Sequence, residues 1–214
     1  MARRKPKGAQ QLQRRQPLRE PYDRVLIVCE GTVTEPAYFR GMKEHYGLST
    51  ANIAITPASG QDPSTVVRHA RRLADDERKL GEKFDRVYCV FDRDEHANFE
   101  GASEQIRASG FCSARSWPCF EYWLLLHYEY RRNPFLAGGD KTAAQHCTTA
   151  LVRKMPAYTK GAQGVFQKLQ GRLDDALNRA ERARRDAEAT GSDNPSTEVH
   201  SLVEYLRNIK RRGN

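Results

Sequence analysis

The stretch Arg24-Val-Leu-Ile-Val-Cys-Glu30-Gly31 indicates the fold class of this chain. Val25 to Cys29 are apolar at consecutive positions, which is typical of a strand buried on both faces of a parallel sheet. The run ends in a carboxylate and a glycine. Because open α/β sheets bind ligands at the carboxyl ends of their strands, we expect Glu30 at a functional edge. Gly31 permits a tight turn or a close backbone approach there.

A second apolar run, Arg86-Val-Tyr-Cys-Val-Phe91, ends in Asp92-Arg93-Asp94. Weaker strand patterns cover residues 52–56 and 111–116, and helical patterns separate the four strands. In one of these helices Asp62 can cap the first turn and Pro63 can occupy its first position. This β-α-β-α-β-α-β order predicts an α/β fold with a mainly parallel central sheet of about four strands and right-handed crossovers.

The second half of the chain is predicted to be helical. A strongly apolar helix covers residues 117–127 and contains Glu121, a carboxylate in an otherwise apolar segment. Further helical patterns follow at about 141–154, 162–189 and 196–211. We therefore predict three parts, which are a basic tail (1–22), an α/β core (23–130) and a helical extension that packs on the core (131–214).

Composition predicts a soluble cytoplasmic protein. Hydrophobic residues make up 38% of the 214 residues and charged residues 29%. No run approaches the roughly 18 apolar residues that span a bilayer, and no secretory signal follows the basic N-terminus. The five cysteines include no C-x-x-C pair, so we expect reduced thiols and not a disulfide framework or a zinc site.

The net charge of +9 is concentrated at the N-terminus. Residues 1–20 contain seven Arg or Lys and one Glu, and we expect this tail to be disordered when free. A basic arm favours a polyanionic partner such as nucleic acid, and the alternative is a solubilising tail. The candidate phosphate-binding residues are Arg3, Arg4, Lys5, Lys7, Arg14, Arg15 and, on a predicted loop, Lys160.

The carboxylates at the two strand ends suit a divalent cation. Asp92 and Asp94 lie two positions apart, so on an extended segment they point to one side, roughly 7 Å apart at Cα. Two carboxylates about 4 Å apart would repel by about 4 kcal/mol at an effective dielectric of 20. A cation removes that repulsion, and oxygen ligands suit Mg²⁺ or Mn²⁺. Alternatively, the segment from Asp94 is a turn with a helix cap.

Two further acids are candidate catalytic residues with alternative interpretations. Glu35 could join the strand-end acids or simply occupy a helix start, where negative charge is favoured. Glu121 could lie near the same acids, since an unpaired buried carboxylate is costly. It could instead pair with an arginine such as Arg115.

Glu30-Gly31 and Asp92-x-Asp94 resemble the corresponding motifs of the Toprim domain. A narrower resemblance, to the RloB-like proteins, extends from about residue 24 to 210. It is carried by five motifs in order, which are Val28-Cys-Glu-Gly31, Thr34-Glu-Pro-x-Tyr-Phe39, Asp92-x-Asp94, Pro118-Cys-Phe-Glu-x-Trp-Leu-Leu-Leu-His127 and Asn194-Pro-Ser-Thr-x-Val-His200.

This resemblance implies a Toprim-like α/β sandwich with a helical C-terminal portion and Mg²⁺-dependent phosphodiester chemistry. It implies that Glu30 acts as acid or base and that Asp92 and Asp94 bind the metal. The clustering of three acids makes Glu30 a further candidate ligand. Relatives occur in bacterial abortive-infection and restriction-linked loci, often beside an ATPase. Thr32 stands where many relatives of this type carry an acid, which weakens any scheme with a second metal near the first strand.

We therefore expect a Mg²⁺-dependent nuclease acting on DNA or RNA in phage defence. A second hypothesis is a nucleic-acid-binding or adaptor subunit that needs a partner ATPase and cleaves nothing alone. The chain contains no G-x-x-x-x-G-K-[ST] motif, so an ATP-driven step would require another chain. A third hypothesis is nucleotidyl transfer, or cleavage of a small nucleotide, at the same metal site.

Overall fold

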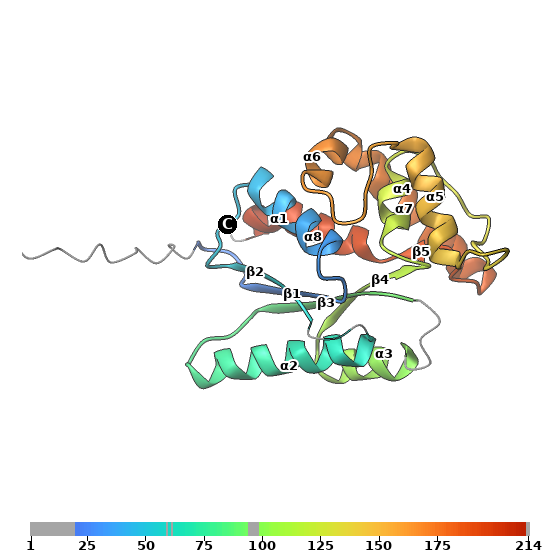
Figure 1. Ribbon diagram of the computed structural model, residues 1–214. Coiled ribbons are helices and arrows are strands. Elements are labelled where there is room, and N and C mark those ends of the chain that lie inside the picture. Colours follow the sequence, from blue (N-terminus) through green and yellow to red (C-terminus); the bar gives the residue numbers. More distant parts are fainter. Residues whose placement is uncertain (1–19, 59, 61, 94–98, 213–214) are drawn as a thin grey trace, which may run out of the picture.

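Five strands form one twisted sheet in the computed structural model, which describes residues 20–58, 60, 62–93 and 99–212 (Figure 1). The strand order is β2-β1-β3-β4-β5. The first four strands are parallel, and β5 is antiparallel to β4. The strands are β1 (Val25–Cys29), β2 (Ile53–Pro57), β3 (Arg86–Asp92), β4 (Cys112–Trp117) and β5 (Ser196–Thr197).

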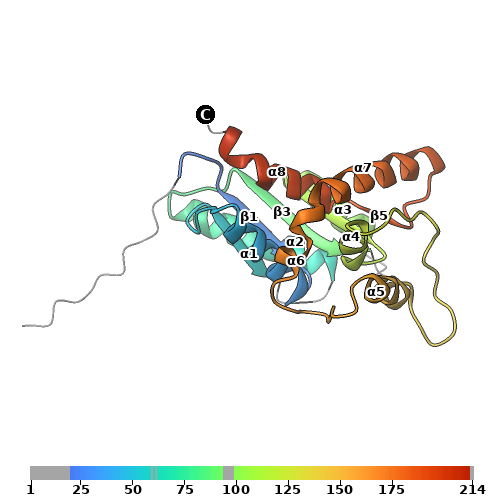
Figure 2. The ribbon, with the colours of Figure 1, turned by 90° about the horizontal axis from the view of Figure 1, so that it is seen from above.

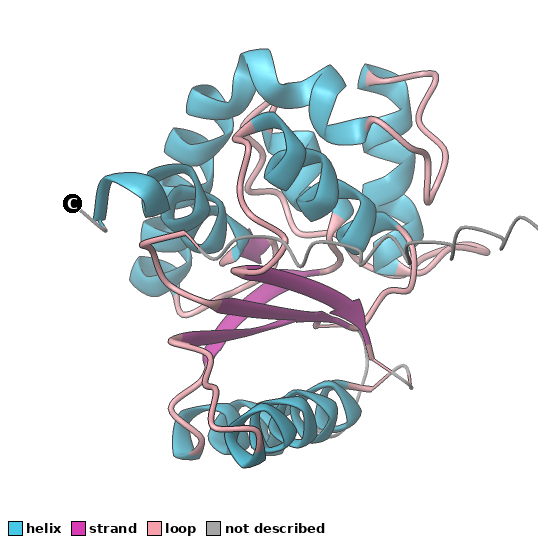
Figure 3. Cartoon of the chain, turned by 90° about the vertical axis from the view of Figure 1, so that its left-hand side faces the viewer, coloured by secondary structure: helices cyan, strands magenta, loops and turns pink. Residues whose placement is uncertain are grey.

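Helices cover both faces of this sheet (Figure 3). Two of them, α2 and α3, lie on one face, and the others form a thicker layer on the opposite face (Figure 1). The amino-terminal α1 and the carboxy-terminal α8 belong to this same thicker layer (Figure 1), which Figure 2 shows from above. The helices are α1 (Thr34–His45), α2 (Pro63–Lys79), α3 (Phe99–Ala108), α4 (Glu121–Leu126), α5 (Ala143–Lys154), α6 (Val165–Leu169), the 3₁₀ helix η1 (Gln170–Arg172), α7 (Leu173–Thr190) and α8 (Val199–Arg212).

The consecutive apolar residues of β1 are explained by burial on both faces. Val25, Ile27 and Cys29 pack into the core beneath the thicker helical layer. Leu26 and Val28 point the other way and pack against α2 and α3. All five side chains are at most 2% exposed, because successive side chains of a strand alternate between faces. The predicted α/β fold with a mainly parallel sheet is therefore confirmed.

The start of α2 also agrees with the sequence. Asp62 accepts hydrogen bonds from the backbone N–H groups of Ser64 and Thr65, and Pro63 is the first helical residue. Asp62 thus satisfies two donors that have no partner within the helix.

Three predicted elements differ from the structure. The helix predicted at 162–189 begins only at Val165, because Gly161 and Gly164 adopt positive φ values of 83° and 72°, and η1 then separates α6 from α7. The helix predicted at 117–127 begins only at Glu121, since β4 continues to Trp117. The helix predicted from 196 begins at Val199, because residues 196–197 form β5 and pair with Trp117 and Ser116.

The cysteines, the length of the apolar helices and the predicted N-terminal tail can each be compared with the structure. All five cysteines are free thiols. No helix in the described part of the chain is long and apolar enough to cross a bilayer. Of the predicted tail, residues 1–19 lie outside the described residues. Residues 20–22 are held beside the start of β2 by hydrogen bonds, since the Asn52 side chain donates to the carbonyls of Glu20 and Tyr22.

Candidate functional site

The ends of β1 and β3 lie side by side and bring Glu30 to Asp92. Cys29 pairs in register with Val90, and the N–H of Glu30 donates to the Val90 carbonyl at 2.8 Å. The Glu30 carboxylate then accepts a hydrogen bond from the backbone N–H of Asp92, with 3.0 Å between N and Oε2. Residues 62 positions apart therefore meet at one edge of the sheet, as the two apolar runs predicted.

Glu35 lies in the first turn of α1, directly against the turn that follows β1. It is 6% exposed. A Cβ atom placed on Gly31 would lie 2.0 Å from Glu35 Oε2, far inside van der Waals contact. Gly31 is therefore required for the close approach of this carboxylate to the backbone, which is one of the two roles that the sequence suggested.

Glu121 begins α4 and is 2% exposed. Its Oε1 accepts a hydrogen bond of 2.9 Å from the Tyr158 hydroxyl. The suggested alternative pairing with Arg115 is wrong, because Arg115 pairs with Glu198, with 2.8 Å between Nε and Oε1. Glu121 is therefore buried without Arg115 as a partner, and its negative charge can interact with the other acids.

Electrostatic interactions join these carboxylates into one cluster. Burial raises the pKa of Asp92 well above its usual range, and the negative charges of Glu35, Glu121 and Glu30 raise this pKa further. Burial is also the main cause that raises the pKa of Glu35, followed by the charge of Glu121. We call Glu30, Glu35, Asp92 and Glu121 the acidic cluster.

Lys160 is the cation that faces the acidic cluster from the loop between α5 and α6. Its pKa is raised, first by the charge of Glu121 and then by Asp92 and Glu35, against an opposing effect of desolvation. The lysine in turn lowers the pKa of Asp92. Within the described part of the chain, the four carboxylates and Lys160 together carry excess negative charge when the acids are ionised, which favours either bound protons or an additional cation.

Hydrogen bonds on both sides of Lys160 hold its loop in place. Tyr158 donates to Glu121 on one side. On the other side, the N–H of Gly161 donates to Thr34 Oγ1 at 2.9 Å. Sequence reasoning identified Lys160 but missed Tyr158 and Thr34, although Tyr158 lay two positions away in the same predicted loop.

The side chains of the acidic cluster are grouped less tightly than those of a preformed metal site. Among the described residues, no three His, Cys, Asp or Glu side chains lie close enough together to hold one metal ion. Asp94, the remaining predicted ligand, lies outside the described residues. The same is true of the predicted phosphate-binding residues Arg3, Arg4, Lys5, Lys7, Arg14 and Arg15.

Comparison with known protein families gives one match, to the description RloB-like protein, over residues 25–206. The matched range begins with β1, ends within α8 and includes all of the acidic cluster and Lys160. No curated protein and no solved structure matches the chain significantly. Because the family match covers most of the sequence, the chain belongs to the RloB-like protein family.

Proposed function

We propose that this protein is a cytoplasmic, Mg²⁺-dependent nuclease of the Toprim type that cleaves nucleic acid in defence against phage. The observation that carries the proposal is the meeting of four carboxylates, from the ends of β1 and β3 and the starts of α1 and α4, beside one lysine. Membership of the RloB-like family and the Toprim resemblance of the two strand ends support it.

The donor chemistry of the acidic cluster fits Mg²⁺, with Mn²⁺ as a substitute. We propose Glu30, Asp92 and Asp94 as the residues that hold the ion. Mg²⁺ commonly takes only one or two carboxylates and keeps several waters, so it does not need three tightly grouped side chains. A divalent cation would also relieve the repulsion that raises the pKa of Asp92.

The residues of the cluster have distinct proposed tasks. The bound ion would polarise the phosphate and activate water. Glu30 takes a proton from the attacking water or delivers one to the leaving oxygen, and Glu35 and Glu121 are further candidates for this exchange. Lys160 binds a phosphate oxygen, and the basic residues of the N-terminal tail add phosphate contacts along the nucleic acid.

Cleavage of DNA and RNA by matched variants tests this proposal. We expect the wild-type protein to cleave with Mg²⁺ and not with EDTA, and we expect Asp92→Asn to be inactive in both. Glu30→Gln should lose about 10²–10⁴-fold in rate, as expected for loss of a general acid or base. Asp175→Asn, which changes a largely exposed aspartate of α7, is the matched control. Equal cleavage by all folded variants, with or without metal, would refute the proposal.

A second function is a nucleic-acid-binding or adaptor subunit that works with a partner ATPase. The observation that favours it is the lack of a tight metal-binding group among the described side chains. This function predicts salt-dependent binding of nucleic acid without turnover, even with Mg²⁺ present. Addition of a partner ATPase would then be needed for any activity.

A further inference from the structure

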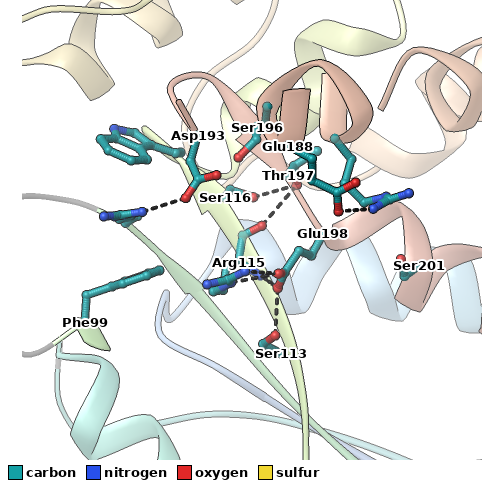
Figure 4. Close-up of a pocket in the computed structure, with 14 residues that line it drawn as sticks. Phe99, Ser113, Arg115, Ser116, Glu188, Asp193, Ser196, Thr197, Glu198 and Ser201 are labelled. Carbon is teal, nitrogen blue, oxygen red and sulfur yellow. Dashed lines mark hydrogen bonds and ion pairs between the residues drawn. The ribbon is translucent and has the colours of Figure 1, made fainter. Parts of the chain in front are cut away.

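A cavity of about 440 Å³ lies beside β4 and β5 (Figure 4). It is next to the strand end that carries Asp92. Ser116, which pairs with Asp92 across the sheet, lines this cavity. So does Arg93, the residue after Asp92, whose N–H donates to the Ser116 carbonyl at 2.7 Å. The cavity is therefore within one residue of the acidic cluster, and its size is that of a small-molecule site.

One wall of the cavity is a stack of alternating aromatic rings and guanidinium groups. The Arg93 guanidinium carbon lies 4.0 Å from the ring centre of Trp117 and 4.5 Å from that of Phe99. Arg115 lies on the same Phe99 ring at 5.4 Å. Trp117 is only partly buried, so this wall presents aromatic surface to a ligand. Nucleobases stack on such surfaces regardless of their sequence.

The charged side chains around the cavity form ion pairs, and the pair of Arg93 with Asp193 is partly exposed. Arg93 Nη1 lies 2.8 Å from Asp193 Oδ2, and the Asp193 side chain is 50% exposed. Arg115 pairs with Glu198, and Arg184 pairs with Glu188 (Figure 4). Exposed ion pairs contribute only about 0–1 kcal/mol, whereas an arginine binds a phosphate through strong, charge-assisted hydrogen bonds. A phosphate can therefore replace Asp193 on Arg93.

We infer that this cavity binds one nucleotide of a single-stranded nucleic acid, next to the bond that is cleaved. The base lies on the aromatic wall, its phosphate takes the place of Asp193 on Arg93, and the hydroxyls of Ser196 and Ser201 face its polar edge. A base enters a cavity of this kind only when it is unpaired and unstacked, and a single strand offers such bases without the few kcal/mol that flipping a base out of a duplex costs. The inference rests on the proposed function for the class of substrate, and it adds that the substrate is single-stranded.

Binding assays in EDTA test the inference without any need for cleavage. The probes are fluorescently labelled oligothymidylate and oligouridylate about 12 nucleotides long, a length within the range that such grooves accept. We expect Arg93→Gln and Trp117→Leu each to weaken binding about fivefold or more. Arg182→Gln is the matched control, because Arg182 also stacks on an aromatic ring, that of Tyr130 at 4.1 Å, but does not line this cavity. Asp193→Asn should strengthen binding, because it releases Arg93.

An abasic oligonucleotide with the same phosphates separates base contacts from phosphate contacts. Trp117→Leu should bind it as well as the wild-type protein does, whereas Arg93→Gln should still bind it more weakly. Trp123 is fully buried, so quenching of the wild-type tryptophan emission by the base-containing probe reports mainly on Trp117. Trp117→Leu should lose that quenching and keep the emission of Trp123.

Two results would overturn the inference. One is wild-type affinity of both folded cavity variants for the single-stranded probes, and the other is a lack of binding of any probe by the wild-type protein. Failure of the nuclease proposal is a separate result. Base-dependent binding in EDTA, without cleavage in Mg²⁺, would refute the nuclease and leave the nucleotide cavity in place. Normal cleavage by both cavity variants, with unchanged affinity for the probes, would refute the nucleotide cavity and leave the nuclease proposal in place.

Discussion

Tyr158 donates its hydroxyl hydrogen to Oε1 of Glu121 across 2.9 Å, although the two residues lie 37 positions apart. Both side chains are at most 4% exposed. This hydrogen bond, together with the one from Gly161 to Thr34, fastens the loop between α5 and α6 to the starts of α4 and α1. The loop therefore belongs to the candidate site, and it brings Lys160 to the acidic cluster.

Tyr158→Phe is predicted to destabilise the protein. The substitution removes one hydroxyl and leaves the buried Glu121 carboxylate without that donor, which typically costs about 1–3 kcal/mol. Urea denaturation would show this as a lower midpoint with an unchanged slope. If the protein is a nuclease, cleavage should fall as well, because the loop that carries Lys160 is loosened.

Tyr128→Phe is the control for this loss. Its hydroxyl makes no hydrogen bond to another described residue, and the side chain is only partly buried. An unfolding free energy of Tyr158→Phe equal to that of the wild-type protein would show that Glu121 does not depend on this donor.

Gly31→Ala is predicted to displace Glu35. The new methyl group would lie 2.0 Å from Glu35 Oε2, so the carboxylate must rotate away or the backbone must shift. Overpacking against a buried side chain such as Glu35 costs about 1–3 kcal/mol, which thermal or urea unfolding can measure. Gly101→Ala is the control, since nothing lies within 4 Å of its added methyl group and alanine favours the helix.

A double-mutant cycle identifies the cause of that loss. Glu35→Ala removes the carboxylate that the new methyl group would strike, so Gly31→Ala combined with Glu35→Ala should be more stable than the sum of the two single effects predicts. Interaction energies of about 0.5–3 kcal/mol are usual for residues in contact. Strict additivity would show that the strain lies elsewhere in the turn.

The meeting of Glu30 and Asp92 could be predicted from sequence, because each residue follows an apolar run long enough to define a buried strand. Parallel strands with consecutive βα connections place their carboxyl ends at one edge, so two strand-end acids have few other places to lie. Gly31 was informative for the same reason, since its position directly after a strand restricts it to a turn.

Lys160 could be named as a candidate phosphate ligand, but its place beside the acidic cluster and the contribution of Tyr158 could not be predicted, because loop packing has no periodic sequence signal. Residues 155–164 form no helix or strand, and their place is set by single hydrogen bonds to α1 and α4. β5 was missed because it has only two residues. The stack of Arg93 between Trp117 and Phe99 joins three elements through side chains alone, and hydrophobic patterns do not report such contacts.

The contribution of Asp92 to the stability of the metal-free protein is predicted to fall with rising pH. Burial and the charges of Glu35, Glu121 and Glu30 hold the folded-state pKa of Asp92 well above its usual range. The folded state thus binds the proton more tightly than the unfolded state. Below about pH 4 Asp92 is protonated in both states and does not reduce the free energy of unfolding. As pH rises from about 4 to the folded-state pKa of Asp92, the protein loses stability. Above that pKa the loss does not increase further.

Asp92→Asn tests the direction of this change of stability with pH, because the amide cannot ionise. In EDTA the Tm of the variant minus that of the wild-type protein should be near zero at about pH 4 and positive near pH 8. A gain of about 2–4 °C corresponds to about 1 kcal/mol in a domain of this size. Mg²⁺ should raise the Tm of the wild-type protein at pH 8 but not that of the variant. A difference that is constant with pH would contradict the raised pKa.

Lys160→Gln is predicted to weaken binding of nucleic acid and to reduce its dependence on salt. If Lys160 contacts one phosphate, its loss should lower the magnitude of the slope of log K against log salt by about 1. Fluorescence anisotropy in EDTA, over a series of salt concentrations, measures this slope without cleavage. The variant also removes the positive charge that lowers the pKa of Asp92, so the fall of stability with pH should become steeper.

Lys168→Gln provides the matched control, because Lys168 is an exposed lysine on α6 and is not among the main causes that shift the pKa of Asp92 or Glu35. Its salt slope should equal that of the wild-type protein if nucleic acid is bound over the acidic cluster. An equal reduction in both variants would mean that the contact is a general attraction to basic surface. An unchanged slope in Lys160→Gln alone would remove this lysine from the binding site, and the charge that it brings to the acids would then serve the stability of the folded chain.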